Sequence, residues 1–175
     1  YPQHRVCGCT VPCVTAMAEA ALDKVADGLY IGPVQAAYKD DELARLNVVA
    51  VVNASGDDYT QRDSVDYLVL DTTLDDDTHG NDDMPAMLQS VEFITAVLQR
   101  NKLARAEAAA ESAEAAEASP PAPSVLVHCH TGKSSRSAAI CCAYLILTEG
   151  MSATDALAAL KRAHPRTDPS ANFVQ

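Results

Sequence analysis

The residues best suited to chemistry lie in one short segment, where an apolar run ends in a cysteine. Ser124-Val125-Leu126-Val127-His128 has the composition of a buried strand, and Cys129 follows it directly. Arg136 and Ser137 then open an apolar helical pattern. The signature loop between them consists of His130, Thr131, Gly132, Lys133, Ser134 and Ser135. The backbone N–H groups of such a loop can turn inward to form an anion nest, and the helix N-terminus adds partial positive charge.

An anion nest at this position would serve a cysteine nucleophile that attacks phosphorus. The nest stabilises the thiolate of Cys129, and the same amides would hold a phosphate group directly above the sulfur. Arg136 can bind two phosphate oxygens with its planar guanidinium, a geometry that lysine does not reproduce. The Ser137 hydroxyl is placed to stabilise the sulfur when a phosphocysteine is hydrolysed. The alternative for Cys129 is a buried structural thiol.

The composition sets limits on the class of protein. A chain of 175 residues, 48% of them hydrophobic, suits one domain with its own core. The net charge of -11 argues against nucleic acid or an anionic membrane as a partner, although a small basic pocket can sit in an acidic surface. No apolar run is long enough to span a bilayer. The chain begins at Tyr1 without a leader pattern, as an excised domain would.

The cysteines indicate a reducing compartment. Six cysteines are too few for a disulfide scaffold of this length. Cys141 and Cys142 fall inside an apolar helical pattern, close in sequence to Cys129, which suits reduced intracellular thiols. We therefore expect a cytoplasmic protein, with the nucleus as a second compartment.

Strand patterns and helix patterns alternate along the chain. Apolar strand patterns occupy residues 29–33, 48–54, 67–70 and 124–128. Helical patterns occupy residues 14–25, 34–46, 84–103, 136–148 and 152–163. The Ala/Glu-rich residues after 103 can lengthen the helix before them, until the prolines at 120–123 end it. The alternation predicts an α/β fold in three layers, with a central, mostly parallel sheet of about four or five strands flanked by helices.

The segment His128-Cys129-x-x-Gly132, followed by Arg136-Ser137, resembles the signature of the protein-tyrosine-phosphatase superfamily, in its dual-specificity branch. Residues 25–55 and 164–175 also resemble the opening and closing patterns of that family. The resemblance implies a phosphatase domain over residues 25–175, with an extension at 1–24 and an Ala/Glu/Pro-rich insertion at about 104–123. It implies hydrolysis of phospho-Tyr and phospho-Ser/Thr in phosphoproteins through a phosphocysteine, without a cofactor or metal ion.

The spacing within the signature departs from the family pattern. The family has five residues between Cys and Arg, whereas residues 130–135 make six here. With Gly132 aligned to the family glycine, the extra residue lies among Lys133, Ser134 and Ser135. Either the loop bulges or Arg136 shifts along the helix start, so a catalytically silent phosphate-binding pseudophosphatase is one alternative. Lys133 motivates another alternative, a phosphatase of phosphoinositides or inositol phosphates.

Cleavage of a phosphate ester also needs a proton donor for the leaving oxygen and then a base for water. The resemblance implies an Asp on a loop after a strand, and the strand pattern at 67–70 is followed by an acidic run. Asp75 lies nearest the family position. Its competitors are Asp76, Asp77 and, more weakly, Asp71. The other interpretation of the run is a solvated acidic loop.

Some remaining residues have two interpretations. Asn53, at the end of a strand pattern, either bonds the signature loop or holds an ordinary turn. His128 is expected to orient the loop and not to act as a base. The sequence leaves the oligomeric state open. A zinc site is not predicted, because the spacing of the four N-terminal candidates matches no standard zinc pattern. These candidates are His4, Cys7, Cys9 and Cys13.

Overall fold

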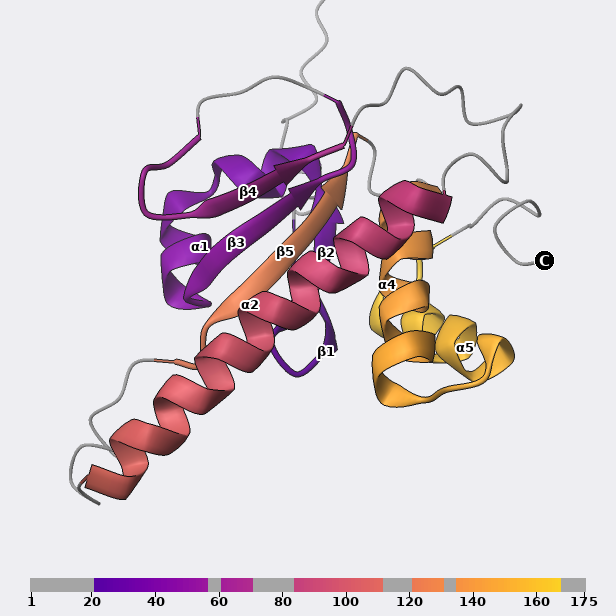
Figure 1. Ribbon diagram of the computed structural model, residues 1–175. Helices are drawn as coiled ribbons and strands as arrows, with labels where there is room; N and C mark the ends of the chain where they lie inside the picture. Colours follow the sequence, from indigo (N-terminus) through magenta and orange to yellow (C-terminus); the bar gives the residue numbers. More distant parts are fainter. Residues whose placement is uncertain (1–20, 57–60, 71–83, 112–120, 131–134, 168–175) are drawn as a thin grey trace, which may run out of the picture.

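The computed structural model describes residues 21–56, 61–70, 84–111, 121–130 and 135–167. A five-stranded sheet in the order β1-β2-β5-β3-β4 forms the centre of the molecule (Figure 1). The strands are β1 (Asp23–Ala26), β2 (Leu29–Pro33), β3 (Val48–Asn53), β4 (Asp66–Val69) and β5 (Ser124–Cys129). The helices are η1 (Val34–Tyr38), α1 (Asp40–Arg45), α2 (Met84–Glu111), α4 (Ser135–Glu149) and α5 (Ala153–Ala163).

The sheet is parallel except for its first strand. β1 pairs antiparallel with β2, whereas β2, β5, β3 and β4 are mutually parallel neighbours. β5 lies in the middle of the sheet, and all six of its residues are buried. A parallel strand covered on both faces needs apolar side chains in both directions, which explains the nearly continuous apolar runs of β3 and β5. The predicted fold class is confirmed.

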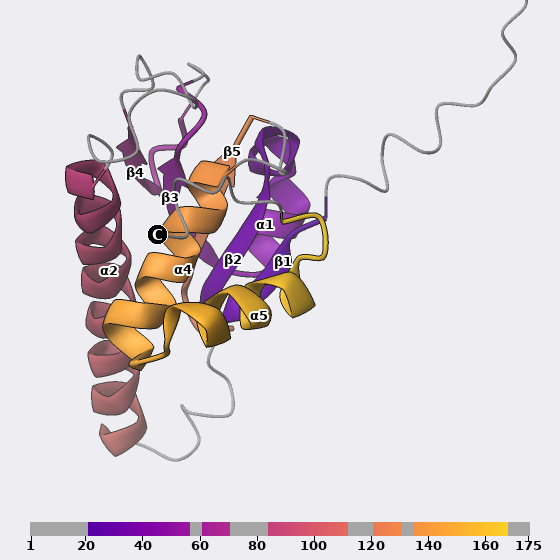
Figure 2. The same ribbon diagram turned by 90° about the vertical axis from the view of Figure 1, so that its right-hand side faces the viewer.

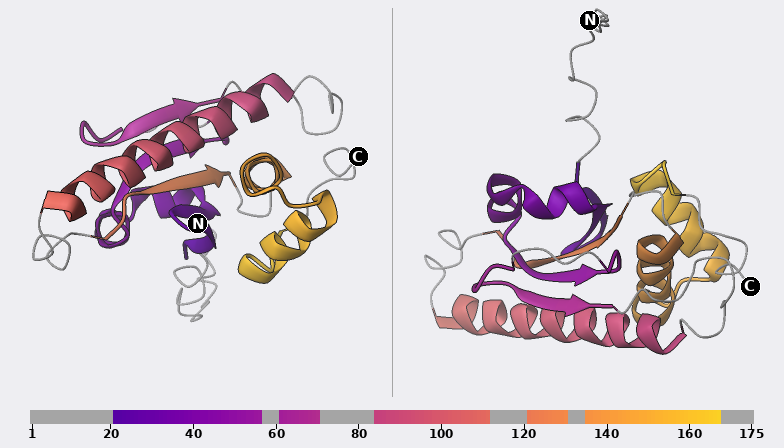
Figure 3. Two further views of the ribbon diagram at one scale, coloured as in Figure 1. Left: turned by 60° about the horizontal axis from the view of Figure 1, so that its bottom comes forward. Right: turned by 90° about the horizontal axis from the view of Figure 1, so that it is seen from above.

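Helices cover both faces of the sheet, and the alternation of side chains along β5 divides the core between them. Val125 and Val127 belong to the larger core cluster, with residues of α2, α4 and α5. Leu126 points to the smaller cluster, which includes Ala37 of η1 and Leu43 of α1. Figures 2 and 3 show α2, α4 and α5 on one side of the sheet and α1 on the other.

The four strand patterns of the sequence are confirmed, with bounds that differ by at most one residue at either end. The helix expected over residues 14–25 is wrong at its end, because Asp23–Ala26 forms β1; residues 14–20 lie outside the described ranges. β1 pairs with β2, as in the partners Lys24 and Tyr30. A four-residue strand at the sheet edge depends on this partner for its backbone hydrogen bonds, and the local sequence does not contain that information.

α2 is longer than its apolar pattern predicted. It runs from Met84 to Glu111, so the Ala/Glu-rich part of the expected insertion continues the helix as far as Glu111. Figure 1 shows the C-terminal part of α2 extending past the sheet. Among the described residues, none of the helices combines the length and the apolar character that crossing a membrane requires.

The two C-terminal helices lie where the sequence predicted, and α4 is one residue longer at each end. Gly150 follows α4 with a φ of 69°, a left-handed conformation that glycine adopts without strain. Ser152 caps α5: its Oγ accepts a hydrogen bond from Asp155 N at 3.1 Å and donates one to the Asp155 carboxylate at 2.7 Å. After α5, His164 Nδ1 lies 2.6 Å from the Asp23 carboxylate, which ties the end of the helix to β1.

Candidate active site

Three parallel strands end at the same edge of the sheet, and Cys129 lies in the middle of that edge. Cys129 is aligned with Pro33 at the end of β2, and His128 is aligned with Asn53 at the end of β3. The Cys129 side chain is 1% exposed. α4 begins at Ser135, the last residue of the signature loop. The strand, loop and helix therefore meet at the carboxyl edge of the sheet, where open α/β sheets bind their ligands.

Ser137 contacts Cys129 directly. It is the third residue of α4 and fully buried, and its Oγ donates a hydrogen bond to Cys129 Sγ at 3.0 Å. A hydrogen bond donated to sulfur favours the charged form over the neutral one. This contact brings together two of the predicted catalytic residues.

Arg136 is the second residue of α4 and is half-buried, at the helix end nearest the sulfur. His130 is exposed, one residue beyond the end of β5. Other predicted site residues lie outside the described residues, namely Thr131, Gly132, Lys133, Ser134, Asp71, Asp75, Asp76 and Asp77; for Ser135 only the backbone is described. The geometry thus joins Cys129 to Ser137, and the catalytic roles of all these residues stay predictions.

Hydrogen bonds at the end of β3 fix the backbone next to Cys129. His128 is fully buried, and its carbonyl accepts a hydrogen bond from Ala54 N at 2.8 Å. Asn53 Oδ1 accepts hydrogen bonds from Ser55 N at 3.0 Å and from Ser55 Oγ at 2.7 Å. Asn53 thereby holds the turn after β3, one of the two roles expected for it. Ser55 was not singled out from the sequence, although a polar Asn-Ala-Ser after a buried strand is a turn signal.

Two further thiols lie on α4 and differ from Cys129 in their surroundings. Cys129, Cys141 and Cys142 are all free cysteines. Burial raises the pKa of Cys141 well above 9.0, and the neighbouring Cys142 and Cys129 raise it further. Burial also raises the pKa of Cys142 above 9.0. Both are thiols at neutral pH, so neither competes as a nucleophile, because the thiolate is the reactive form.

Within the described ranges, no three or more His, Cys, Asp or Glu side chains gather in a way that could hold a metal ion. The four N-terminal zinc candidates, His4, Cys7, Cys9 and Cys13, lie outside those ranges.

Comparison with known proteins identifies related folds. Residues 113–175 match the family model described as "Dual specificity phosphatase, catalytic domain". No curated protein sequence matches the chain. Human DUSP28 is 27% identical with a TM-score of 0.58, over 87% of this chain and 86% of that one. The human tyrosine phosphatase-like serine/threonine/tyrosine-interacting protein is 25% identical with a TM-score of 0.65, over 87% and 90%. DUSP15 is 22% identical with a TM-score of 0.66, over 87% and 81%.

The matched segment includes β5, Cys129 and α4, so sequence similarity and site geometry coincide in the same part of the molecule. This chain has the fold of the dual-specificity phosphatases, and its residues 113–175 match the family model of a dual specificity phosphatase catalytic domain.

Proposed function

We propose that this chain is a dual-specificity protein phosphatase that hydrolyses phospho-Tyr and phospho-Ser/Thr through a phosphocysteine at Cys129. The observation that supports the proposal most is the 3.0 Å hydrogen bond from Ser137 Oγ to Cys129 Sγ. A structural thiol in the core needs no hydroxyl partner, whereas a thiolate nucleophile is stabilised by one. The proposed site, at the junction of β5 and α4, falls inside the segment that matches the family model.

The reaction proceeds in two displacements. The Cys129 thiolate attacks phosphorus, and the bond from phosphorus to the ester oxygen breaks while Asp75 donates a proton to that oxygen. The loop amides and Arg136 hold the other phosphate oxygens. In the second step the Asp75 carboxylate takes a proton from water, whose oxygen attacks phosphorus. The phosphorus–sulfur bond breaks, and Ser137 stabilises the departing thiolate.

The extra residue of the signature loop is part of the proposal. We expect the loop before α4 to bulge and so absorb this residue, while Arg136 keeps its place at the helix start. The position of Arg136 in the first turn of α4 supports this arrangement, because a side chain there remains next to the N-terminal backbone N–H groups of the helix.

A matched pair of cysteine variants tests the mechanism. Cys129→Ser is expected to abolish hydrolysis of a small aryl phosphate and of phosphopeptides, while phosphopeptide binding persists. Cys142→Ser makes the same change at a thiol outside the mechanism and is expected to retain turnover. Rapid-quench kinetics should show a phosphocysteine burst in the natural chain. Hydrolysis that survives in Cys129→Ser would overturn the proposal.

The six-residue loop also supports a second candidate, a phosphate-binding pseudophosphatase. One similar protein is named a tyrosine phosphatase-like interacting protein. A pseudophosphatase would bind phosphopeptides without a phosphocysteine burst and without turnover.

Lys133 motivated another substrate class, phosphoinositides or inositol phosphates. Turnover measured on inositol phosphates and on phosphopeptides in parallel tests this alternative.

A further inference from the structure

A short turn at the carboxyl edge of the sheet lies between the two strands that lead to the proposed nucleophile and the proposed acid. The turn at the end of β3 consists of Asn53, Ala54 and Ser55. β3 has β5 on one side and β4 on the other (Figure 1). β5 ends at Cys129, and Leu70, directly after β4, is the last described residue before the acidic run. The turn is therefore placed to set these two strand ends relative to each other.

One peptide unit of the turn bonds both neighbouring strands. On one side, Ala54 N donates a hydrogen bond to the His128 carbonyl at 2.8 Å, next to the nucleophile. On the other side, Leu70 N donates to the Asn53 carbonyl at 3.0 Å. The Asn53 carbonyl and the Ala54 N–H belong to the same peptide unit, which is planar and rigid. A rotation or shift of this unit would therefore move the end of β4 relative to the end of β5.

The Asn53 side chain fixes the orientation of that peptide unit. It is 1% exposed, and its Oδ1 accepts hydrogen bonds from Ser55 N at 3.0 Å and from Ser55 Oγ at 2.7 Å. An asparagine that accepts a hydrogen bond from the backbone two residues on forms an Asx turn, which holds the peptide units in between. Asn53 is also the last residue that β3 pairs with either neighbour, so the side chain holds the backbone where the ladders end.

We propose that Asn53 is a positioning residue of the phosphatase reaction: its side chain holds the peptide unit that sets the strand before the general acid against the strand of the nucleophile. This role rests on the proposed function. It does not depend on which aspartate donates the proton, because Asp71, Asp75, Asp76 and Asp77 all follow β4 in the chain. Proton transfer needs the acid within hydrogen-bond reach of the leaving oxygen, so a small shift of β4 against β5 weakens it.

Two aryl phosphates with different leaving groups test this role. p-Nitrophenolate is a weakly basic leaving group that departs readily without a proton, whereas the more basic phenolate needs one from the acid. The kcat/KM value covers the first displacement, in which the leaving group departs. In Asn53→Ala we expect kcat/KM for phenyl phosphate to fall about tenfold more than for p-nitrophenyl phosphate. Loss of folded enzyme, or a misplaced nucleophile, would lower both values equally.

Asn47→Ala is the matched control, because Asn47 lies just before β3, at the opposite end of the strand. Its Nδ2 donates a hydrogen bond to the Pro121 carbonyl at 2.6 Å, and its φ is 49°. Alanine there removes a hydrogen bond and strains the backbone, so it should lower the free energy of unfolding with the ratio of the two kcat/KM values unchanged. Ser55→Ala removes one of the two bonds to Asn53 Oδ1 and should change the ratio as Asn53→Ala does, by a smaller factor.

The outcomes separate this role from the proposed function. If the natural chain hydrolyses both esters and Asn53→Ala lowers both kcat/KM values equally, or neither, Asn53 is not a positioning residue and the proposed function stands. An equal change of the ratio in Asn47→Ala would also overturn the role. If the natural chain hydrolyses neither ester, the proposed function fails and the role fails with it. Should Asn53→Ala not fold, a ratio in Ser55→Ala equal to that of the natural chain overturns the role.

Discussion

Ser137 Oγ donates a hydrogen bond to Cys129 Sγ at 3.0 Å, across the whole signature loop. The two residues are eight positions apart in the sequence, and both side chains are buried. In the proposed reaction this bond would stabilise the sulfur when it leaves phosphorus in the second step. The position of the first turn of α4 therefore determines whether Ser137 can reach the sulfur that takes part in the proposed reaction.

Ser137→Ala is expected to lower kcat by about 10- to 100-fold with a smaller change in KM. Hydrogen bonds to charged groups contribute about 1.5–3 kcal/mol, and about 1.4 kcal/mol corresponds to a tenfold change in rate. Because the sulfur is the leaving group in the second step, the phosphocysteine should accumulate in the variant. Rapid-quench detection of this intermediate, with steady-state kinetics, measures both effects.

Ser152→Ala provides a matched control for this prediction. It removes the N-cap of α5 and should lower the free energy of unfolding by about 1 kcal/mol, with kcat unchanged. A loss of kcat equal to that of Ser137→Ala would mean that stability, and not the bond to sulfur, limits the reaction.

The free energy of unfolding should fall as the pH rises above about 9. Burial raises the pKa of Cys141, Cys142 and Tyr144 in the folded chain, and Glu149 adds to the effect at Tyr144. The unfolded chain therefore releases these protons at a lower pH than the folded chain does. The stability from these neutral groups is complete below pH 9.0 and is lost as the pH rises toward their folded-state pKa values. Urea unfolding measured across alkaline pH tests this slope.

Cys141→Val should flatten the alkaline slope, because the most deeply buried of the three groups no longer titrates. Ile140→Val is the control on the same helix: it should lower the free energy of unfolding by about 0.5–1.5 kcal/mol at every pH, with the slope unchanged. If the free energy of unfolding falls with pH equally steeply in the natural chain and in Cys141→Val, the Cys141 thiol does not contribute to the slope.

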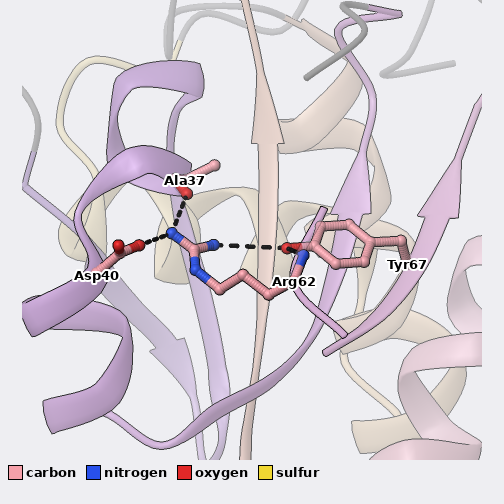
Figure 4. Close-up of polar contacts among 4 residues, drawn as sticks. All are labelled: Ala37, Asp40, Arg62 and Tyr67. Carbon is pink, nitrogen blue, oxygen red and sulfur yellow. Dashed lines mark hydrogen bonds and ion pairs between the residues drawn. The ribbon is translucent and has the colours of Figure 1, made fainter. Parts of the chain in front are cut away.

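Arg62 is expected to stabilise the fold more than Arg100 does. The Arg62 guanidinium donates to the Ala37 carbonyl, the Asp40 carboxylate and the Tyr67 hydroxyl, and so joins η1, α1 and β4 (Figure 4). Its side chain is 28% exposed, whereas that of Arg100, paired with Asp66, is 64% exposed. Arg62→Met should cost about 1–3 kcal/mol of unfolding free energy and Arg100→Met less than about 1 kcal/mol. Equal losses in urea unfolding would refute the difference.

Two glycines with the same backbone conformation should respond differently to alanine. Gly28 and Gly150 have φ values of 77° and 69°. A Cβ at Gly28 would lie 2.8 Å from Leu98 Cδ2 and 3.3 Å from the Pro123 carbonyl oxygen, whereas one at Gly150 would meet no atom within 4 Å. Gly150→Ala should cost only the left-handed strain, about 1–2 kcal/mol, and Gly28→Ala more, in thermal unfolding. A larger stability loss for Gly150→Ala than for Gly28→Ala would show that the Leu98 side chain moves aside easily.

Much of the fold could be predicted because its signals are local. The apolar runs of β3 and β5 reflect burial on both faces, and Ser152 and Gly150 mark helix ends through their own backbone chemistry. β1 was mistaken for part of a helix, because only its pairing with β2 makes a strand of that segment.

Part of the candidate site could likewise be predicted from the sequence, and part depends on the tertiary structure. The order Cys129, loop, Arg136, Ser137 is a property of the sequence, and it determined which chemistry to expect. Only the tertiary structure decided that Ser137 Oγ reaches the sulfur, because this depends on how α4 packs on β5. The peptide unit at the end of β3 likewise gains its hydrogen bonds to both neighbouring strands only in the tertiary structure, because β4 and β5 come from different parts of the chain and meet β3 only in the sheet.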